Sequence, residues 1–187
     1  MFFRLTAIAT IAAGLTECAA PPGPESSTSV PAARPLDTLP AGADLALIRQ
    51  DLLATAADRF GAQSLSQARA APTYLIVKRF AGMPPPPLPG ADPNWRPPVP
   101  AALLMKAAGG WMVAEGGDWR PARAGAAAEL DRVLADNRFW SEPASSTSCP
   151  DYGAALLLLK VPGKAETTRR SGCPDAGDAL VSAALRA

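Results

Sequence analysis

The sequence predicts an α+β fold, in which a mainly antiparallel sheet of about four or five strands carries helices on one face and one disulfide. Three observations lead to this class. The apolar runs are short and come in pairs joined by tight turns, which is typical of hairpins. Segments with helical spacing stand between these pairs rather than after each single strand. Cys149 and Cys173 bracket the last pair.

The first predicted elements are a helix, a short helical turn and a strand. The helix covers residues 44–60, with Asp44 as its cap and Gly61 at its end. Its apolar residues share one stripe: Leu45, Ile48, Leu52 and Ala56. Residues 63–71 are polar and are expected to form the short turn. Residues 73–80 are rich in β-branched and aromatic side chains, which favours a strand.

A proline-rich loop and a hairpin follow. Residues 83–100 contain nine prolines around Trp95, so we expect an extended, polyproline-like surface loop. Residues 101–108 and 111–115 are apolar runs joined at Gly109 and Gly110, a good hairpin signal. The Gly-Gly-Asp sequence at 116–118 is expected to end the second of these strands.

The last part of the domain is predicted to be helix, hairpin, helix. A helix is expected over residues 126–138, and Phe139 and Trp140 after it are expected to fill the core. Residues 154–161 are the most apolar run and suit a strand that is buried on both faces. Pro162 and Gly163 fit a type II turn into a more polar strand over 164–171. Asp175 is expected to cap a final helix that reaches Leu185.

The two cysteines of this hairpin are predicted to form a disulfide. Cys149 stands just before one strand and Cys173 just after its partner, and the open ends of a hairpin lie roughly 5 Å apart. That separation is within the range that a disulfide bridges. The alternative is a pair of buried free thiols, which an exported protein does not usually keep.

The N-terminus is predicted to be an export signal over residues 1–18. Arg4 precedes an apolar run from Leu5 to Leu15, a pattern typical of secretory signal peptides. The run is shorter than the roughly 20 residues that span a bilayer. The alternative is a buried N-terminal helix, but the proline-rich segment that follows gives such a helix nothing to pack on.

The four residues that end at Cys18 (LTEC) resemble the lipobox of bacterial lipoproteins. The resemblance covers only this stretch and implies that Cys18 is lipidated and becomes the first residue of the mature protein. Glu17 departs from the pattern, which has a small residue before the cysteine. The alternative is cleavage by the ordinary signal peptidase after Ala19 or Ala20. The chain has three cysteines, so a disulfide leaves one over, and lipidation accounts for it.

Residues 19–42 are rich in Pro, Ala and Ser and are predicted to be an extended tether to a single globular domain at 43–187. The Phe-Trp pair after a helix and the cysteine-bracketed hairpin resemble the layout of small α+β lipoproteins of proteobacterial envelopes. The export signal and the predicted disulfide, rather than this resemblance, predict a location on the periplasmic face of a bacterial membrane, or in the soluble periplasm if Cys18 carries no lipid. The resemblance implies no activity.

The sequence offers few residues for chemistry. The net charge is +1 and there is no histidine, which excludes a nucleic-acid footprint, His-dependent triads and most zinc sites. No nucleophile elbow, phosphate-binding loop or Cys-x-x-Cys motif occurs, so no cofactor is expected. Two carboxylate pairs were considered as acid and base: Glu115 with Asp118, and Glu129 with Asp131. In neither pair does the spacing in the sequence indicate an acid–base pair more than chance would.

The motif Cys-Pro-Asp-x-Gly occurs at Cys149 and again at Cys173. If the disulfide forms, Asp151, Asp175 and Asp178 could meet and bind a hard cation such as calcium. Turn and helix-cap chemistry explains the same aspartates more simply, so no metal site is predicted.

A Pro-x-x-P match at residues 84–87 and four tryptophans are the remaining features. We interpret the proline segment as a stiff arm. Trp95 beside prolines could form a sticky surface, although folding back over the edge of the core is the simpler expectation. Trp111 and Trp119 have no assigned role.

Two functions from different classes remain. The first is a non-catalytic binding, structural or inhibitory module of the bacterial cell envelope, anchored to the membrane by a lipid, with a protein or envelope polymer as its partner. The second is a small secreted hydrolase that uses carboxylates on a cell-wall or glycan substrate. A cleft that holds two facing carboxylates, one of them desolvated, would favour the hydrolase.

Overall fold

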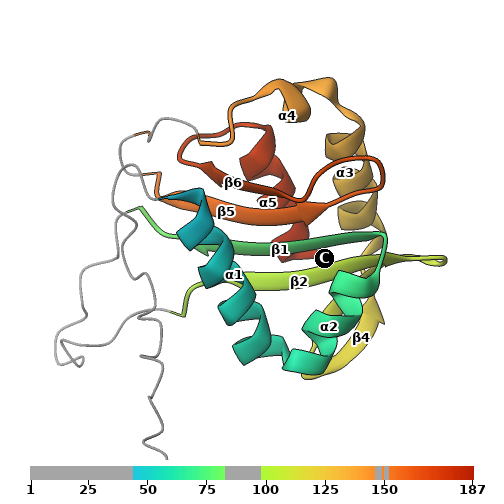
Figure 1. The fold of residues 1–187 in the computed structure, drawn as a ribbon. Helices are drawn as coiled ribbons and strands as arrows, with labels where there is room; N and C mark the ends of the chain where they lie inside the picture. Colours follow the sequence, from blue (N-terminus) through green and yellow to red (C-terminus); the bar gives the residue numbers. More distant parts are fainter. Residues whose placement is uncertain (1–43, 83–97, 146–148, 150–151) are drawn as a thin grey trace, which may run out of the picture. The chain divides into compact units, whose positions relative to one another are not determined.

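The computed structural model describes residues 44–82, 98–145, 149 and 152–187. Within them the elements are α1 (Leu45–Phe60), α2 (Ala62–Ala70), β1 (Thr73–Phe80), β2 (Ala101–Ala107), β3 (Gly110–Glu115), β4 (Asp118–Pro121), α3 (Ala124–Ala135), α4 (Asn137–Ser141), β5 (Ala154–Lys160), β6 (Thr167–Ser171) and α5 (Ala176–Arg186). The strands form one six-stranded sheet in the order β4-β3-β2-β1-β5-β6 (Figure 1). All neighbouring strands are antiparallel, which confirms the α+β prediction with one strand more than expected.

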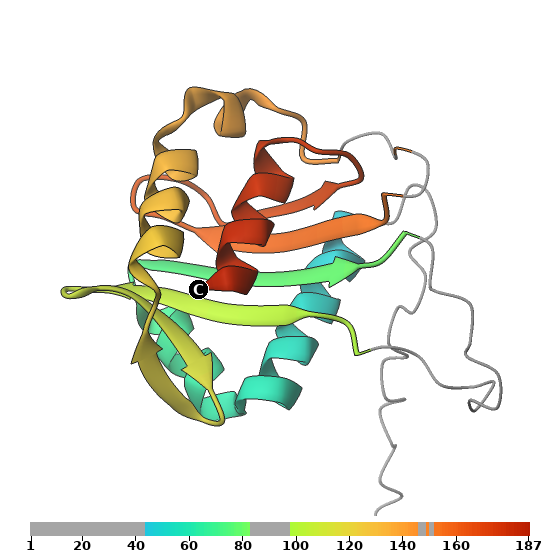
Figure 2. The same cartoon turned by 180° about the vertical axis from the view of Figure 1, so that it is seen from behind.

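Helices cover both faces of the sheet, whereas the sequence analysis expected them on one face. Figure 1 shows α1 and α2 in front of the sheet, and Figure 2 shows α3 and α5 in front of the opposite face. The central strand β1 supplies both cores, because its alternate side chains point to opposite faces. Tyr74 and Ile76 pack with α1, while Leu75 and Val77 pack with α3 and α5. A strand that is buried at nearly every position needs cover on both sides, which is why one helical layer is not enough.

Local signals set most element ends. The Asp44 side chain accepts a hydrogen bond from Ala46 N at 2.8 Å and caps α1, as predicted. Gly61 ends α1 with a φ of 87°. The region after it is the regular helix α2 rather than a short turn. The helix predicted over 126–138 is two helices, because the Asp136 side chain accepts from Arg138 N and starts α4.

The prediction missed strand β4. The glycines at 116 and 117 were expected to end the sheet there, but both have positive φ, 61° and 96°, and form a tight turn. Glu115 therefore pairs with Asp118 across a new hairpin. The preceding hairpin turns one residue earlier than expected, since Ala107 pairs with Gly110.

Several predicted features lie outside the described residues. They are the export signal, the lipidation residue Cys18, the tether, the Pro-x-x-P segment, Trp95 and Asp151. In the described part of the chain, no helix combines the length and apolar character needed to cross a membrane.

Candidate functional site

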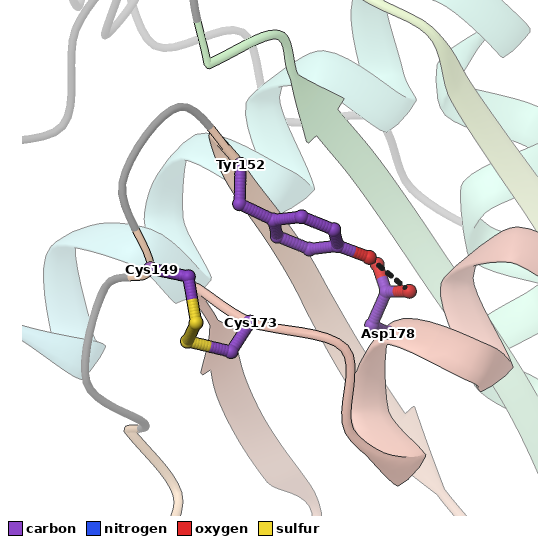
Figure 3. The surroundings of a disulfide bond; sticks show 4 residues. All are labelled: Cys149, Tyr152, Cys173 and Asp178. Carbon is purple, nitrogen blue, oxygen red and sulfur yellow. Dashed lines mark hydrogen bonds between the residues drawn. A yellow bond between two sulfur atoms is a disulfide. The ribbon is translucent and has the colours of Figure 1, made fainter.

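The disulfide predicted between Cys149 and Cys173 is present (Figure 3). The two Cα atoms lie 5.1 Å apart, and the bridge joins the segment before β5 to the segment after β6. Cys149 N also donates a hydrogen bond to Gly172 O at 2.8 Å, which continues the antiparallel pairing beyond the strands. The bracketed-hairpin prediction is therefore confirmed in its topology.

A buried polar network lies beside the disulfide. The Tyr152 hydroxyl donates to Asp178 Oδ2 at 2.6 Å, as Figure 3 shows, and Arg79 forms an ion pair with Asp178 Oδ1. Arg79 also donates to Ser182 Oγ at 2.9 Å. Burial, followed by the hydrogen bond and the charge of Asp178, raises the pKa of Tyr152. Tyr152 is therefore neutral, and the charge of Asp178 is balanced by Arg79. The network links α5 to β1 and offers no free acid or base.

The aspartates considered for calcium do not form a metal site. Asp175 Oδ1 accepts from Asp178 N at 2.8 Å, which is the helix cap that the sequence favoured. The Asp178 carboxylate is occupied by Arg79 and Tyr152. Across the described residues, no group of three or more His, Cys, Asp or Glu side chains is arranged to hold a metal ion.

The two candidate carboxylate pairs are not acid–base pairs. Glu115 forms an ion pair with Arg120, and Glu129 pairs with Arg132 at 2.6 Å. Hydrogen bonding to Arg132 lowers the pKa of Glu129, which leaves it a poor proton donor. Asp131 points to different partners altogether, namely Lys106 and Trp111.

An open cleft of about 510 Å³ is the most site-like feature in the described residues. Its lining residues place it at the end of the sheet where β1 begins and β5 ends, next to the C-terminal end of α3. Its lining combines two tryptophans, two lysines and one carboxylate with small and apolar residues: Thr73, Lys106, Trp111, Asp131, Leu134, Ala135, Trp140, Val161 and Lys164.

One side of the cleft is built on the β2–β3 hairpin. Lys106 and Trp111 are cross-strand partners, and Lys106 Nζ lies 5.7 Å from the Trp111 ring centroid. Asp131 Oδ1 accepts from Lys106 Nζ at 2.7 Å and from Trp111 Nε1 at 2.8 Å. Burial by itself would raise the pKa of Asp131, but these two hydrogen bonds and the Lys106 charge outweigh it and lower the pKa. Asp131 is thus an ionised anchor for the Trp111 indole at neutral pH.

The other side of the cleft is built on α4 and the β5–β6 connection. Trp140 Nε1 donates to Leu134 O at 2.9 Å, and the ring stands edge-on to the fully buried Phe139 at 4.8 Å. Lys164 Nζ lies 4.5 Å from the Trp140 ring centroid. Within the described residues, no carboxylate forms an ion pair with Lys164. The cleft therefore has an exposed ammonium held over an indole without a counter-charge.

Sequence reasoning did not find this cleft. The sequence predicts that Trp140 fills the core, whereas in the structure it is only half-buried and lines the cleft. Trp111 has no predicted role, and neither lysine is singled out by the sequence. The Lys106–Trp111 pair could have been read from the hairpin only with its turn at Ala108 and Gly109, since the expected turn at Gly109 and Gly110 places Ala108 opposite Trp111. The Trp140–Lys164 contact could not, since it joins segments whose approach depends on the whole fold.

A buried ion pair on the other face of the sheet was also missed. Lys78 Nζ lies 3.0 and 2.9 Å from the two Asp51 oxygens and 3.3 Å from Thr55 Oγ1. The two charged side chains are only 6% and 12% exposed. The pair joins β1 to α1, opens into no cleft described above, and serves the fold.

Comparisons with protein-family models, with curated proteins and with solved structures found no match to this chain.

Proposed function

We propose that this protein is an exported, lipid-anchored binding module of the bacterial cell envelope, and that it binds its partner without transforming it. The observation that carries the binding function is the tryptophan–lysine cleft. Two indoles and two ammoniums converge there on a concave surface, which is the composition expected of a recognition site with few polar anchors.

The chemistry of the cleft favours binding over the hydrolase alternative. Glycoside hydrolysis ordinarily needs two carboxyl groups that face each other, one of them with a raised pKa. The cleft contains Asp131 alone, and its pKa is lowered. Elsewhere in the described residues, the other carboxyl groups with resolved shifts are also lowered: Glu129, Asp136 and Glu166. None of these groups is suited to hold a proton for a leaving group at neutral pH.

The export part of the proposal is supported by the Cys149–Cys173 disulfide. Such bonds form and persist in oxidising compartments and are rare in the reducing cytosol. The basic start and apolar run at the N-terminus indicate the same location. The lipid anchor rests on the lipobox resemblance at Cys18 and on the need to account for a third cysteine in an exported chain.

Fractionation of cells that express the full chain tests this location. We expect the protein in the membrane fraction, with a mature N-terminal peptide that begins at a diacylglycerol-modified Cys18. A Cys18→Ser variant is expected to be exported but soluble. An unmodified peptide that starts after Cys18 would remove the lipid anchor, and a full-length chain that retains Met1 in the cytosol would remove export as well.

A further inference from the structure

We propose that the tryptophan–lysine cleft binds a carboxylate-bearing sugar of the cell envelope, with Lys164 as the principal contact for the carboxylate. This inference rests on the proposed binding function and adds the class of ligand.

The charges select an anion. Lys106 and Lys164 bring two positive charges, and Asp131 brings one negative charge that already pairs with Lys106. The cleft thus has an excess of one positive charge, located at Lys164. A lysine ammonium binds an anion as a point charge with three donors. One carboxylate therefore neutralises the cleft, whereas a phosphate dianion would leave it with excess negative charge.

The walls select a ring with one apolar face. Trp140 is half-buried, so part of its indole remains open to the cleft, and Leu134 and Val161 extend this apolar surface. A pyranose presents C–H groups on its face and hydroxyls around its edge, which suits an indole wall next to charged groups. A purely apolar ligand would have to desolvate both lysines without replacing their hydration.

The indoles are held in place before a ligand arrives. Trp111 is 3% exposed and its Nε1 is fixed by Asp131, while the Trp140 Nε1 is fixed by a backbone carbonyl. Little side-chain freedom is left for these rings to lose on binding, which favours affinity. The volume of about 510 Å³ lies within the range of about 300–1,000 Å³ found for small-molecule sites.

Two matched ligand pairs test the proposal by protein-detected NMR titration, which registers millimolar binding. N-acetylmuramic acid differs from N-acetylglucosamine by a lactyl ether group that carries a carboxylate, and galacturonic acid has a carboxylate where galactose has a hydroxymethyl group. The protein is the soluble Cys18→Ser chain purified after export. We expect each acid to bind at least about tenfold more tightly than its neutral partner, as a charge-assisted contact implies. The shifted signals should include the Trp140 indole.

Variants locate the contact. Lys164→Gln is expected to weaken binding of the acids about tenfold and to leave the neutral sugars unaffected. Lys160→Gln, a lysine outside the cleft, is the matched control and should change neither. Preference for N-acetylmuramic acid alone would assign the site to peptidoglycan, and equal binding of both acids would assign it to carboxylated sugars in general. Either result supports the proposal.

Three outcomes would overturn it: equal affinity for acid and neutral sugars, no detectable binding of either acid, or an unchanged affinity in Lys164→Gln. Tighter binding of glucose 6-phosphate than of either acid would also contradict the charge argument. If the protein still fractionates with the membrane and carries lipid at Cys18, the anchored module stands and only the ligand assignment fails.

Discussion

Removal of the disulfide should weaken the domain by a predictable amount without unfolding it. The proposed change is the double variant Cys149→Ala, Cys173→Ala. The bridge closes a loop across a sequence separation of 24 residues. In the chain-entropy description, freeing a loop of that length in the unfolded state costs about 3.5 kcal/mol at 25 °C. A domain of this size has a total stability of about 5–15 kcal/mol, so the variant should remain folded.

The structure explains why the fold should survive this change. The loop that the bridge closes contains β5, which is apolar and buried between β1 and β6 and packs on both cores. Those contacts do not depend on the cysteines. The Tyr152–Asp178 hydrogen bond adds a second link between the segment before β5 and α5. We therefore expect the variant to lose stability only because its unfolded chain gains entropy, while the packing of the sheet stays the same.

Denaturant unfolding followed by tryptophan fluorescence measures the effect. Reduction should lower the unfolding free energy of the wild-type protein by about 3.5 kcal/mol. The double-alanine variant should have the unfolding free energy of the reduced wild type, and reductant should not change it. A difference in unfolding free energy below about 1 kcal/mol between oxidised wild type and the variant would contradict this prediction, because a disulfide with so small an effect does not constrain the unfolded chain.

Three further predictions follow from single contacts. Asp51→Ala should destabilise the protein by about 3–5 kcal/mol, because it leaves the Lys78 ammonium buried without its counter-charge, while Asp51→Leu with Lys78→Met should recover most of the loss in thermal melts. Gly153→Ala should cost more than Gly163→Ala: both glycines have positive φ, but a Cβ on Gly153 would overlap the Phe80 carbonyl oxygen, whereas nothing lies within 4 Å at Gly163. A Gly163→Ala variant as unstable as Gly153→Ala would contradict this. Burial opposes ionisation of Glu166, but hydrogen bonds from Tyr74 and Arg49 outweigh it and lower its pKa below 4.5. The stability that ionised Glu166 contributes is therefore complete above pH 4.5 and is lost as the pH falls through the lowered pKa. Glu166→Gln should therefore flatten the acid limb of the stability profile, and an unchanged limb would show that other carboxyl groups dominate it.

Features that depend on neighbouring residues were predicted well from the sequence. Strand β1 runs from Thr73 to Phe80, as its β-branched and aromatic composition indicated. The cap at Asp44 and the cap at Asp175 both form as expected. The disulfide was also predictable, because a hairpin brings its open ends together whatever surrounds it.

Features that depend on distant segments were not predicted. The apolar run in β5 was expected to be buried on both faces, and this requires two helical layers, yet the assignment of helices to one face did not follow that requirement. The sequence around Lys78 did not indicate that this lysine is buried or that its ion-pair partner lies on α1. Trp140 and Lys164 meet only because α4 and the β5–β6 connection lie at the same end of the sheet. Local propensity carries no information about such meetings.

The oxidation state of Cys149 and Cys173 inside living cells shows whether this protein matures outside the cytoplasm. Cells that make the full chain are quenched with acid, free thiols are alkylated, and the peptides are identified by mass spectrometry before and after reduction. We expect both cysteines to be alkylated only after reduction. When export is blocked, both should be alkylated without prior reduction. If both cysteines are free thiols in cells in which export is not blocked, the proposed location outside the cytoplasm is wrong, whatever the cleft binds.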